Sequence, residues 1–184
     1  MSSKTISTKD LVTTALLIAI GILIPIIFTP LRVIVGPFTA TLTAHVPVII
    51  AMFISPWAAI FTAIGTAIGF VFSSPLVVAA RAASHLIFAI VGAFMIQKRC
   101  NLILTWLVTT VLHALFEAIV VWLFFLGGIS APPAGYSSMI MVLITAIGTA
   151  GHHTVDYIIA YIIMAAALVR MKAVPPIPHL WRNK

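Results

Sequence analysis

Three ionisable side chains stand close together late in the chain, in the segment Gly151-His152-His153-Thr154-Val155-Asp156-Tyr157. This segment opens an apolar run that ends at Val169. His152 and Asp156 are four residues apart, so they share one face of a helix. Ionisable side chains within an apolar span usually face a bundle interior or a water-filled cavity, because lipid makes them costly. The segment therefore predicts a polar site inside a helical bundle.

Two earlier segments repeat this spacing of ionisable side chains. Arg81 and His85 are four residues apart, as are His113 and Glu117. An arginine can bind a carboxylate, and a carboxylate can accept hydrogen bonds from hydroxyl or amino groups. We therefore predict a set of substrate-binding residues made of Arg81, His85, His113, Glu117, His152, His153 and Asp156.

A purely structural interpretation of the same charges stays open. Arg81 could pair with Glu117 or Asp156 only to neutralise buried charge and to hold the bundle together. His45 stands two residues before Pro47, and we expect it only to bond to a backbone carbonyl that a proline kink frees.

Histidine and carboxylate side chains also build metal and catalytic sites. The sequence, however, contains no H-E-x-x-H, no serine elbow G-x-S-x-G and no phosphate loop G-x-x-x-x-G-K-[ST]. We therefore expect no catalytic residue, no metal ligand and no cofactor. If the protein drives uphill transport, a partner must supply the energy.

The composition predicts an integral membrane protein, since 62% of the 184 residues are hydrophobic and only 7% are charged. A helix crosses the hydrocarbon core with about 20 residues, so the chain accommodates about six spans and no sizeable soluble domain. The formal charge of +7 comes from basic residues at the ends of apolar runs. We interpret them as topology signals and not as a nucleic-acid patch.

Residues 1–184 are predicted to form a single all-α transmembrane domain, a compact six-helix bundle. Proline, glycine and serine mark the breaks between its helices. The predicted helices cover residues 9–29, 39–55, 57–72, 75–97, 101–126 and 152–170, followed by a basic tail over 171–184. Residues 31–38 are expected to form an external loop. Residues 139–150 are either a re-entrant segment or the first part of one long helix from Ser138.

The basic residues cluster on one side of this six-helix arrangement, so both termini are predicted to be cytoplasmic. If the last helix begins near His152, then Arg81, Glu117 and Asp156 all lie in the outer half of the membrane. The prediction is an outward-facing polar pocket. Two other hypotheses stay open: an ion-coupled secondary transporter or channel that uses these groups as a proton relay, and an intramembrane metalloenzyme.

The first predicted helix carries a small-xxx-small pair, Ala15 and Ala19. Such pairs let two helices approach closely. Spacing alone favours ordinary packing of this pair inside the bundle.

In length and motifs the chain resembles the S components, the substrate-binding membrane subunits, of energy-coupling factor (ECF) vitamin transporters. The features that carry the resemblance are Ala15-x-x-x-Ala19, residues 9–21 with the proline-rich loop that follows, His45-Val46-Pro47, Arg81-x-x-x-His85 and His152-x-x-x-Asp156. The resemblance implies a multi-pass protein in the cell membrane of a Gram-positive bacterium. It also implies a transmembrane coupling protein and two cytoplasmic ATPases as partners, with Ala15 and Ala19 packed against the coupling protein.

The resemblance further implies a vitamin bound near the outer face and released inside the cell. Pyridoxine or hydroxymethylpyrimidine, pantothenate and niacin are all compatible with the predicted pocket. Arg81 favours an acid, whereas Glu117 together with Asp156 favours a ring that bears hydroxyl or amino groups. We slightly favour the pyridoxine and hydroxymethylpyrimidine type.

Overall fold

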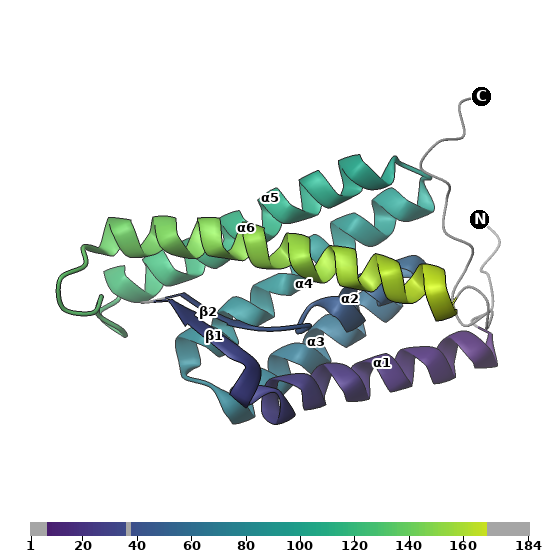
Figure 1. Cartoon of the computed structure of the whole chain (residues 1–184), viewed down its shortest axis with the longest axis horizontal. Helices are drawn as coiled ribbons and strands as arrows, with labels where there is room; N and C mark the ends of the chain where they lie inside the picture. The colour runs from purple at the N-terminus through teal and green to yellow at the C-terminus, as the bar shows by residue number, and fades with distance from the viewer. Residues whose placement is uncertain (1–6, 36–37, 169–184) are drawn as a thin grey trace.

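The computed structural model describes residues 7–35 and 38–168. Long helices lie side by side and form a bundle, and a small hairpin reaches in among them (Figure 1). The helices are α1 (Thr8–Ile27), α2 (Val46–Ile54), α3 (Pro56–Ser73), α4 (Leu76–Gln97), α5 (Leu102–Leu126) and α6 (Ser138–Ile163). The other described elements are the short helical turns η1 (Thr29–Leu31) and η2 (Met164–Leu168) and the strands β1 (Arg32–Val35) and β2 (Phe38–Thr41).

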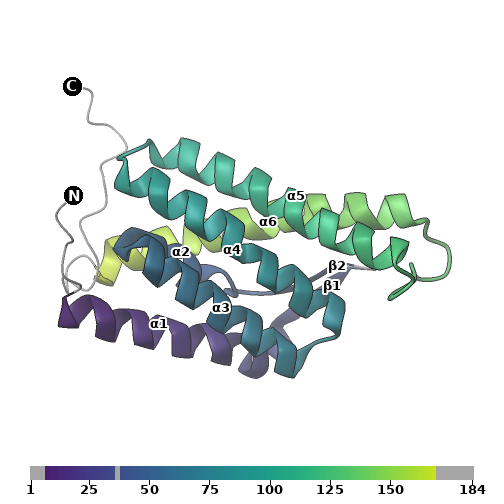
Figure 2. The same cartoon turned by 180° about the vertical axis from the view of Figure 1, so that it is seen from behind.

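Five of the described helices, α1, α3, α4, α5 and α6, are long and apolar enough to cross a bilayer. Helix α2 has only nine residues, about half of what a spanning helix needs. The prediction of a helical membrane bundle is confirmed, but the described residues do not form six full-length spanning helices. The start of α1 and the end of α6 lie at the same end of the bundle (Figures 1 and 2). The predicted basic tail, 171–184, lies outside the described residues.

The second predicted helix, residues 39–55, is wrong in its first part. Residues 38–41 form β2, residues 42–45 form a turn, and α2 begins only at Val46. Pro47 therefore lies in the first turn of α2, where its missing N–H is tolerated, and it does not kink the helix. After α1, the chain returns into the bundle as extended backbone in β2 and becomes helical at the start of α2 (Figure 2).

Within the expected loop over residues 31–38, residues 32–35 form β1, which pairs with β2 in an antiparallel hairpin that sets Arg32 opposite Thr41. The guanidinium of Arg32 holds this hairpin in place. It donates to Thr41 Oγ1 at 3.1 Å, and to the carbonyl oxygens of Pro25 and Ser73 at 3.3 Å each. The hairpin is thereby fixed to the ends of α1 and α3.

Residues 138–163 form one continuous helix. The re-entrant alternative for residues 139–150 is therefore wrong, and the alternative of one long last helix is confirmed. Asp156 follows Ser138 by 18 residues, which places it about 27 Å from the start of α6. Glu117 lies nine residues, about 14 Å, from the end of α5 that adjoins α6. Counted along their own helices, the two carboxylates therefore lie at different distances from the loop that joins α5 and α6, because the last helix begins earlier than expected.

The first and third helices cross closely at two glycines. A Cβ atom added at Gly65 would lie 3.0 Å from the side chain of Ile18, and one added at Gly69 would clash with the carbonyl oxygen of Ile22. The approach at Gly69 requires glycine, and the approach at Gly65 is tight, as is common for small residues at helix crossings in membranes.

Candidate substrate site

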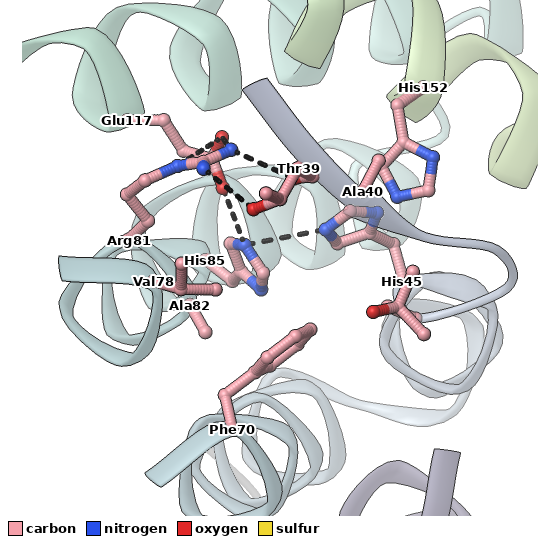
Figure 3. A pocket seen from close by; sticks show the side chains of 12 residues that line it. Thr39, Ala40, His45, Phe70, Val78, Arg81, Ala82, His85, Glu117 and His152 are labelled. Atoms are coloured by element: carbon pink, nitrogen blue, oxygen red, sulfur yellow. Dashed lines mark hydrogen bonds and ion pairs between the residues drawn. The ribbon is translucent and has the colours of Figure 1, made fainter. Parts of the chain in front are cut away.

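Arg81 on α4 and Glu117 on α5 form a buried ion pair (Figure 3). The Nη2 and Nε atoms of Arg81 donate to Glu117 Oε2 at 2.7 and 3.1 Å. Each side chain exposes only 6% of its surface. The pair brings two opposite charges together in an apolar bundle, where either charge alone would be costly.

Strand β2 covers the Arg81 guanidinium. The Nη1 and Nη2 atoms of Arg81 donate to the hydroxyl and the carbonyl oxygen of Thr39, respectively, both at a long 3.4 Å. The ring of Phe38 lies 5.8 Å from the guanidinium carbon, within the range of a cation–π contact. Arg81 is therefore held firmly by Glu117 and more loosely by the hairpin.

Glu117 collects contacts from three helices. Its Oε1 atom lies 3.1 Å from His85 Nε2 on α4 and 3.4 Å from His113 Nε2 on its own helix. Its Oε2 atom accepts a hydrogen bond from the hydroxyl of Thr149 on α6. The carboxylate is thus the junction at which α4, α5 and α6 meet.

His45 joins this junction to the second buried carboxylate. Its Nε2 atom lies 3.3 Å from His85 Nε2, and its Nδ1 atom lies 3.0 Å from Asp156 Oδ2. Asp156 has no direct ion pair with Arg81 in the described part of the chain. The predicted group of Arg81, Glu117 and Asp156 is therefore connected, but only through two imidazoles.

Asp156 binds the backbone that precedes α2. Its two carboxylate oxygens accept hydrogen bonds from the N–H groups of Thr43 and His45, each at 3.0 Å. Thr43 has a φ of +68°, a strained conformation for a β-branched residue. The N–H groups at the start of a helix have no partner within the helix. Here Asp156, a side chain of another helix, accepts the N–H groups of Thr43 and His45.

The remaining predicted residues, His152 and His153, take different positions. His153 is completely buried, with Nδ1 3.0 Å from His113 Nδ1 and Nε2 3.1 Å from the Thr109 hydroxyl. His152 is less buried, and its Nε2 atom lies 3.5 Å from Asp156 Oδ2. His153 therefore supports the ring of His113, whereas His152 borders the space beside His45.

A small hollow lies between β2, α4 and the polar side chains (Figure 3). Its volume is about 20 Å³, which is room for about one water molecule. The lining residues are Thr39, Ala40, Thr41, Ala44, His45, Phe70, Val78, Arg81, Ala82, His85, Glu117 and His152. Four of the predicted site residues line it, while His113, His153 and Asp156 stand behind this first layer.

The chain is 34% identical over 166 residues to the niacin transporter NiaX of Lactococcus lactis subsp. cremoris (strain MG1363), an alignment that covers 86% of this chain and 74% of NiaX. It belongs to the S components of ECF transporters. No protein-family model and no solved structure matches the chain.

Membership in this family confirms that the S component is a multi-pass membrane protein for vitamin uptake. It also implies an ECF energising module and a vitamin as partners. The preference for pyridoxine or hydroxymethylpyrimidine is not supported, because the matched relative is named as a niacin transporter. That preference gave too much weight to Glu117 and Asp156, whose oxygens are occupied by Arg81, histidines and backbone N–H groups.

Sequence reasoning undervalued His45 in this S component. It was expected only to bond to a carbonyl near a kink, yet it touches both His85 and Asp156. Thr39 and Thr149 were missed altogether. Two signals were present for His45: it directly precedes a helix with Pro47 in its first turn, and it is an ionisable residue in a strongly apolar stretch.

Two larger hollows in the S component are apolar and lie on the sides of the bundle. One, of about 360 Å³, is lined by residues of α5 and α6 that include Trp106 and Tyr157. The other, of about 410 Å³, lies between α3 and α4. Their walls lack the convergent polar groups of a site for a water-soluble ligand, so the smaller polar hollow is the candidate site.

Proposed function

We propose that this S component binds niacin, or a vitamin of the same type, in the hollow beside Arg81. The observation that carries the proposal is a buried guanidinium that faces a hollow and holds Thr39 only by long hydrogen bonds. A pyridine carboxylate offers what this guanidinium prefers, two coplanar oxygens with a negative charge. The name of the Lactococcus relative, a niacin transporter, supports the same substrate.

The other walls of the hollow suit a flat aromatic ring. Phe70, Val78 and Ala82 supply apolar surface opposite the polar groups. His45 and His152 supply ring nitrogens at the far side. This combination of apolar walls with a few convergent polar groups is typical of small-molecule sites.

The hairpin must move for the vitamin to bind. The hollow has room for about one water, far less than a pyridine ring with its carboxylate. Strand β2 forms the wall through Thr39, Ala40 and Thr41. The wall is held to Arg81 by long hydrogen bonds, so we infer that the β1–β2 hairpin opens the site.

Transport requires an energising module, and α1 offers a surface for it. Ala15 and Ala19 are exposed on α1, on a side that no described helix covers, which argues against the packing role that spacing alone suggested. We assign the pair to docking against the coupling protein, with ATP hydrolysis by two partner ATPases. The common end of α1 and α6 would then face the cytoplasm.

Calorimetry on the purified full-length protein in detergent tests the substrate. We expect nicotinate to bind and nicotinamide to bind about 10- to 100-fold more weakly, because the amide cannot form the charge-assisted pair with Arg81. Equal affinities for the two ligands would show that the Arg81 guanidinium does not bind the carboxylate. Binding of pyridoxine in preference to both would overturn the niacin assignment.

A further inference from the structure

Three imidazoles converge beneath the hollow. One ring nitrogen from each of His45, His85 and His113 lies within 4.8 Å of those of the other two. The rings come from three places: the turn before α2, α4 and α5. All three side chains are buried, so the convergence is built by the fold and is not a surface coincidence.

The spacing of these atoms matches a four-coordinate metal site. The Nε2 atoms of His45 and His85 are 3.3 Å apart, and a tetrahedral ion with bonds of about 2.0–2.1 Å to nitrogen separates two ligands by about 3.3 Å. Glu117 Oε1 lies 3.1 Å from His85 Nε2 and 3.4 Å from His113 Nε2. The carboxylate is therefore in position to be the fourth ligand.

A second layer of side chains turns the rings toward this point. The Nδ1 atom of His45 lies 3.0 Å from Asp156 Oδ2, and the Nδ1 atom of His113 lies 3.0 Å from His153 Nδ1. An Nδ1–H group donated to a carboxylate leaves a lone pair on Nε2. This arrangement is the usual support of a metal-binding histidine.

Three buried imidazole nitrogens of the described residues, His85 Nδ1, His113 Nε2 and His152 Nε2, have no hydrogen-bond partner, and the second of them faces the proposed ion position. His113 Nε2 has no hydrogen-bond partner among the residues that the structure describes, although the His113 side chain is almost fully buried. A buried polar atom without a partner is costly, and a metal ion would satisfy it. The ion could enter through the hollow, because His45, His85 and Glu117 line it.

We propose that His45, His85, His113 and Glu117 bind a divalent transition metal ion, with Zn²⁺ as the best match. Three imidazoles and one carboxylate are the ligand set that such an ion prefers.

Charge balance supports this proposal, in a step that rests on the proposed function. The buried charges at the site are one guanidinium, Arg81, and two carboxylates, Glu117 and Asp156. A vitamin with its own carboxylate would add a third negative charge. A divalent cation would bring the sum with the bound vitamin to zero, since +1, −2, −1 and +2 cancel.

A second group in the same region competes for one ligand. His45, His152 and Asp156 also place one ligand atom each within 4.8 Å of the others. Asp156, however, already accepts two backbone N–H groups. In the first group the Nε2 atoms of His45 and His85 contact only each other and Glu117 Oε1, which are proposed ligands themselves, so it is the group we propose.

Metal titration of the full-length, vitamin-free protein in detergent tests the proposal. After treatment with a chelator, calorimetry with Zn²⁺ should give one bound ion per chain. His85→Gln and His113→Gln should each lower the affinity at least about 10-fold. His179→Gln, a matched histidine substitution in the C-terminal tail, should leave it unchanged.

Cobalt spectroscopy on the unmodified protein needs no variant and so is independent of variant folding. Bound Co²⁺ should give the intense visible absorption of a four-coordinate ion. A weak six-coordinate spectrum, or no stoichiometric Zn²⁺, would overturn the proposal. Loss of Zn²⁺ binding in His152→Gln but not in His113→Gln would overturn it as well. Nicotinate binding, measured on the same preparation, separates failure of the metal site from failure of the vitamin site.

Discussion

Asp156 on α6 accepts the backbone N–H group of His45, the residue directly before α2, at 3.0 Å. The same carboxylate also accepts the N–H group of Thr43. A side chain from the last helix thus holds the point at which the second segment changes from extended to helical.

Substitution of Asp156 should therefore destabilise the fold. Asp156→Ala leaves the buried N–H group and ring of His45 and the half-buried N–H group of Thr43 without their acceptor, at a cost of up to about 1–3 kcal/mol for each buried group. Thermal unfolding in detergent should show a clearly lowered Tm. Asp10→Ala, near the start of α1, should lower it much less, because Asp10 is only partly buried. Equal effects of the two substitutions would contradict the capping role.

Arg81 should be required for vitamin binding through its geometry as well as its charge. Arg81→Gln should weaken nicotinate binding about 10- to 100-fold. Arg81→Lys should recover only part of this loss, because lysine cannot form the two-pronged pair. Arg99→Gln serves as the control, since Arg99 is exposed beyond the end of α4. A lysine variant with full affinity would show that charge alone suffices.

The hairpin should open more often when Arg32 is replaced. Arg32→Gln removes the donors to Pro25 and Ser73, so the amides of residues 38–41 should exchange hydrogen faster. Mass spectrometry of deuterated peptides measures this, with the α5 peptides as an internal control. Nicotinate should also associate and dissociate faster. If both rates stay unchanged while exchange rises, the hairpin is not the route into the site.

Bulk on the exposed side of α1 should block transport without blocking binding. Ala15→Trp and Ala19→Trp should keep nicotinate affinity in detergent and lose uptake in cells that supply the energising module. Ala83→Trp is the matched control, because Ala83 is exposed on α4. Normal uptake with tryptophan at both α1 positions would exclude this side of α1 as the docking surface.

Two glycine substitutions should act in opposite directions. Gly69→Ala drives a Cβ atom into the backbone of Ile22, and overpacking of this kind costs about 1–3 kcal/mol. Gly151→Ala meets open space within α6 and should raise stability by up to about 1 kcal/mol. Tm values of the two variants check the sign of each effect. A neutral Gly69→Ala would mean that α1 and α3 pack less closely than the structure shows.

Apolar periodicity and breaks predicted most of the helices, because long apolar runs ended by proline, serine or glycine leave few alternatives in a membrane. The same reasoning failed for residues 38–45, where Thr39, Thr41 and Thr43 alternate with apolar residues in a pattern that is typical of a strand. The turn that follows this strand depends also on Asp156, far along the chain, which binds Thr43 and His45. Such a distant contact leaves no local signal.

The site was predicted in its residue types and only partly in its arrangement. Helical spacing correctly grouped Arg81 with His85 and His113 with Glu117, since each pair lies on one helix. Spacing could not predict that Glu117 forms the ion pair with Arg81, whereas Asp156 accepts hydrogen bonds from the backbone that precedes α2. The role of His45 depends on the turn between β2 and α2, which helical spacing does not describe.

The side chains that shape the hollow belong to β2, the turn before α2, α3, α4, α5 and α6, whereas Ala15 and Ala19 belong to α1. No position serves both surfaces. If the coupling protein docks on α1 as proposed, changes in the hairpin and the histidines could alter ligand preference among relatives and leave the docking surface of the first helix unchanged.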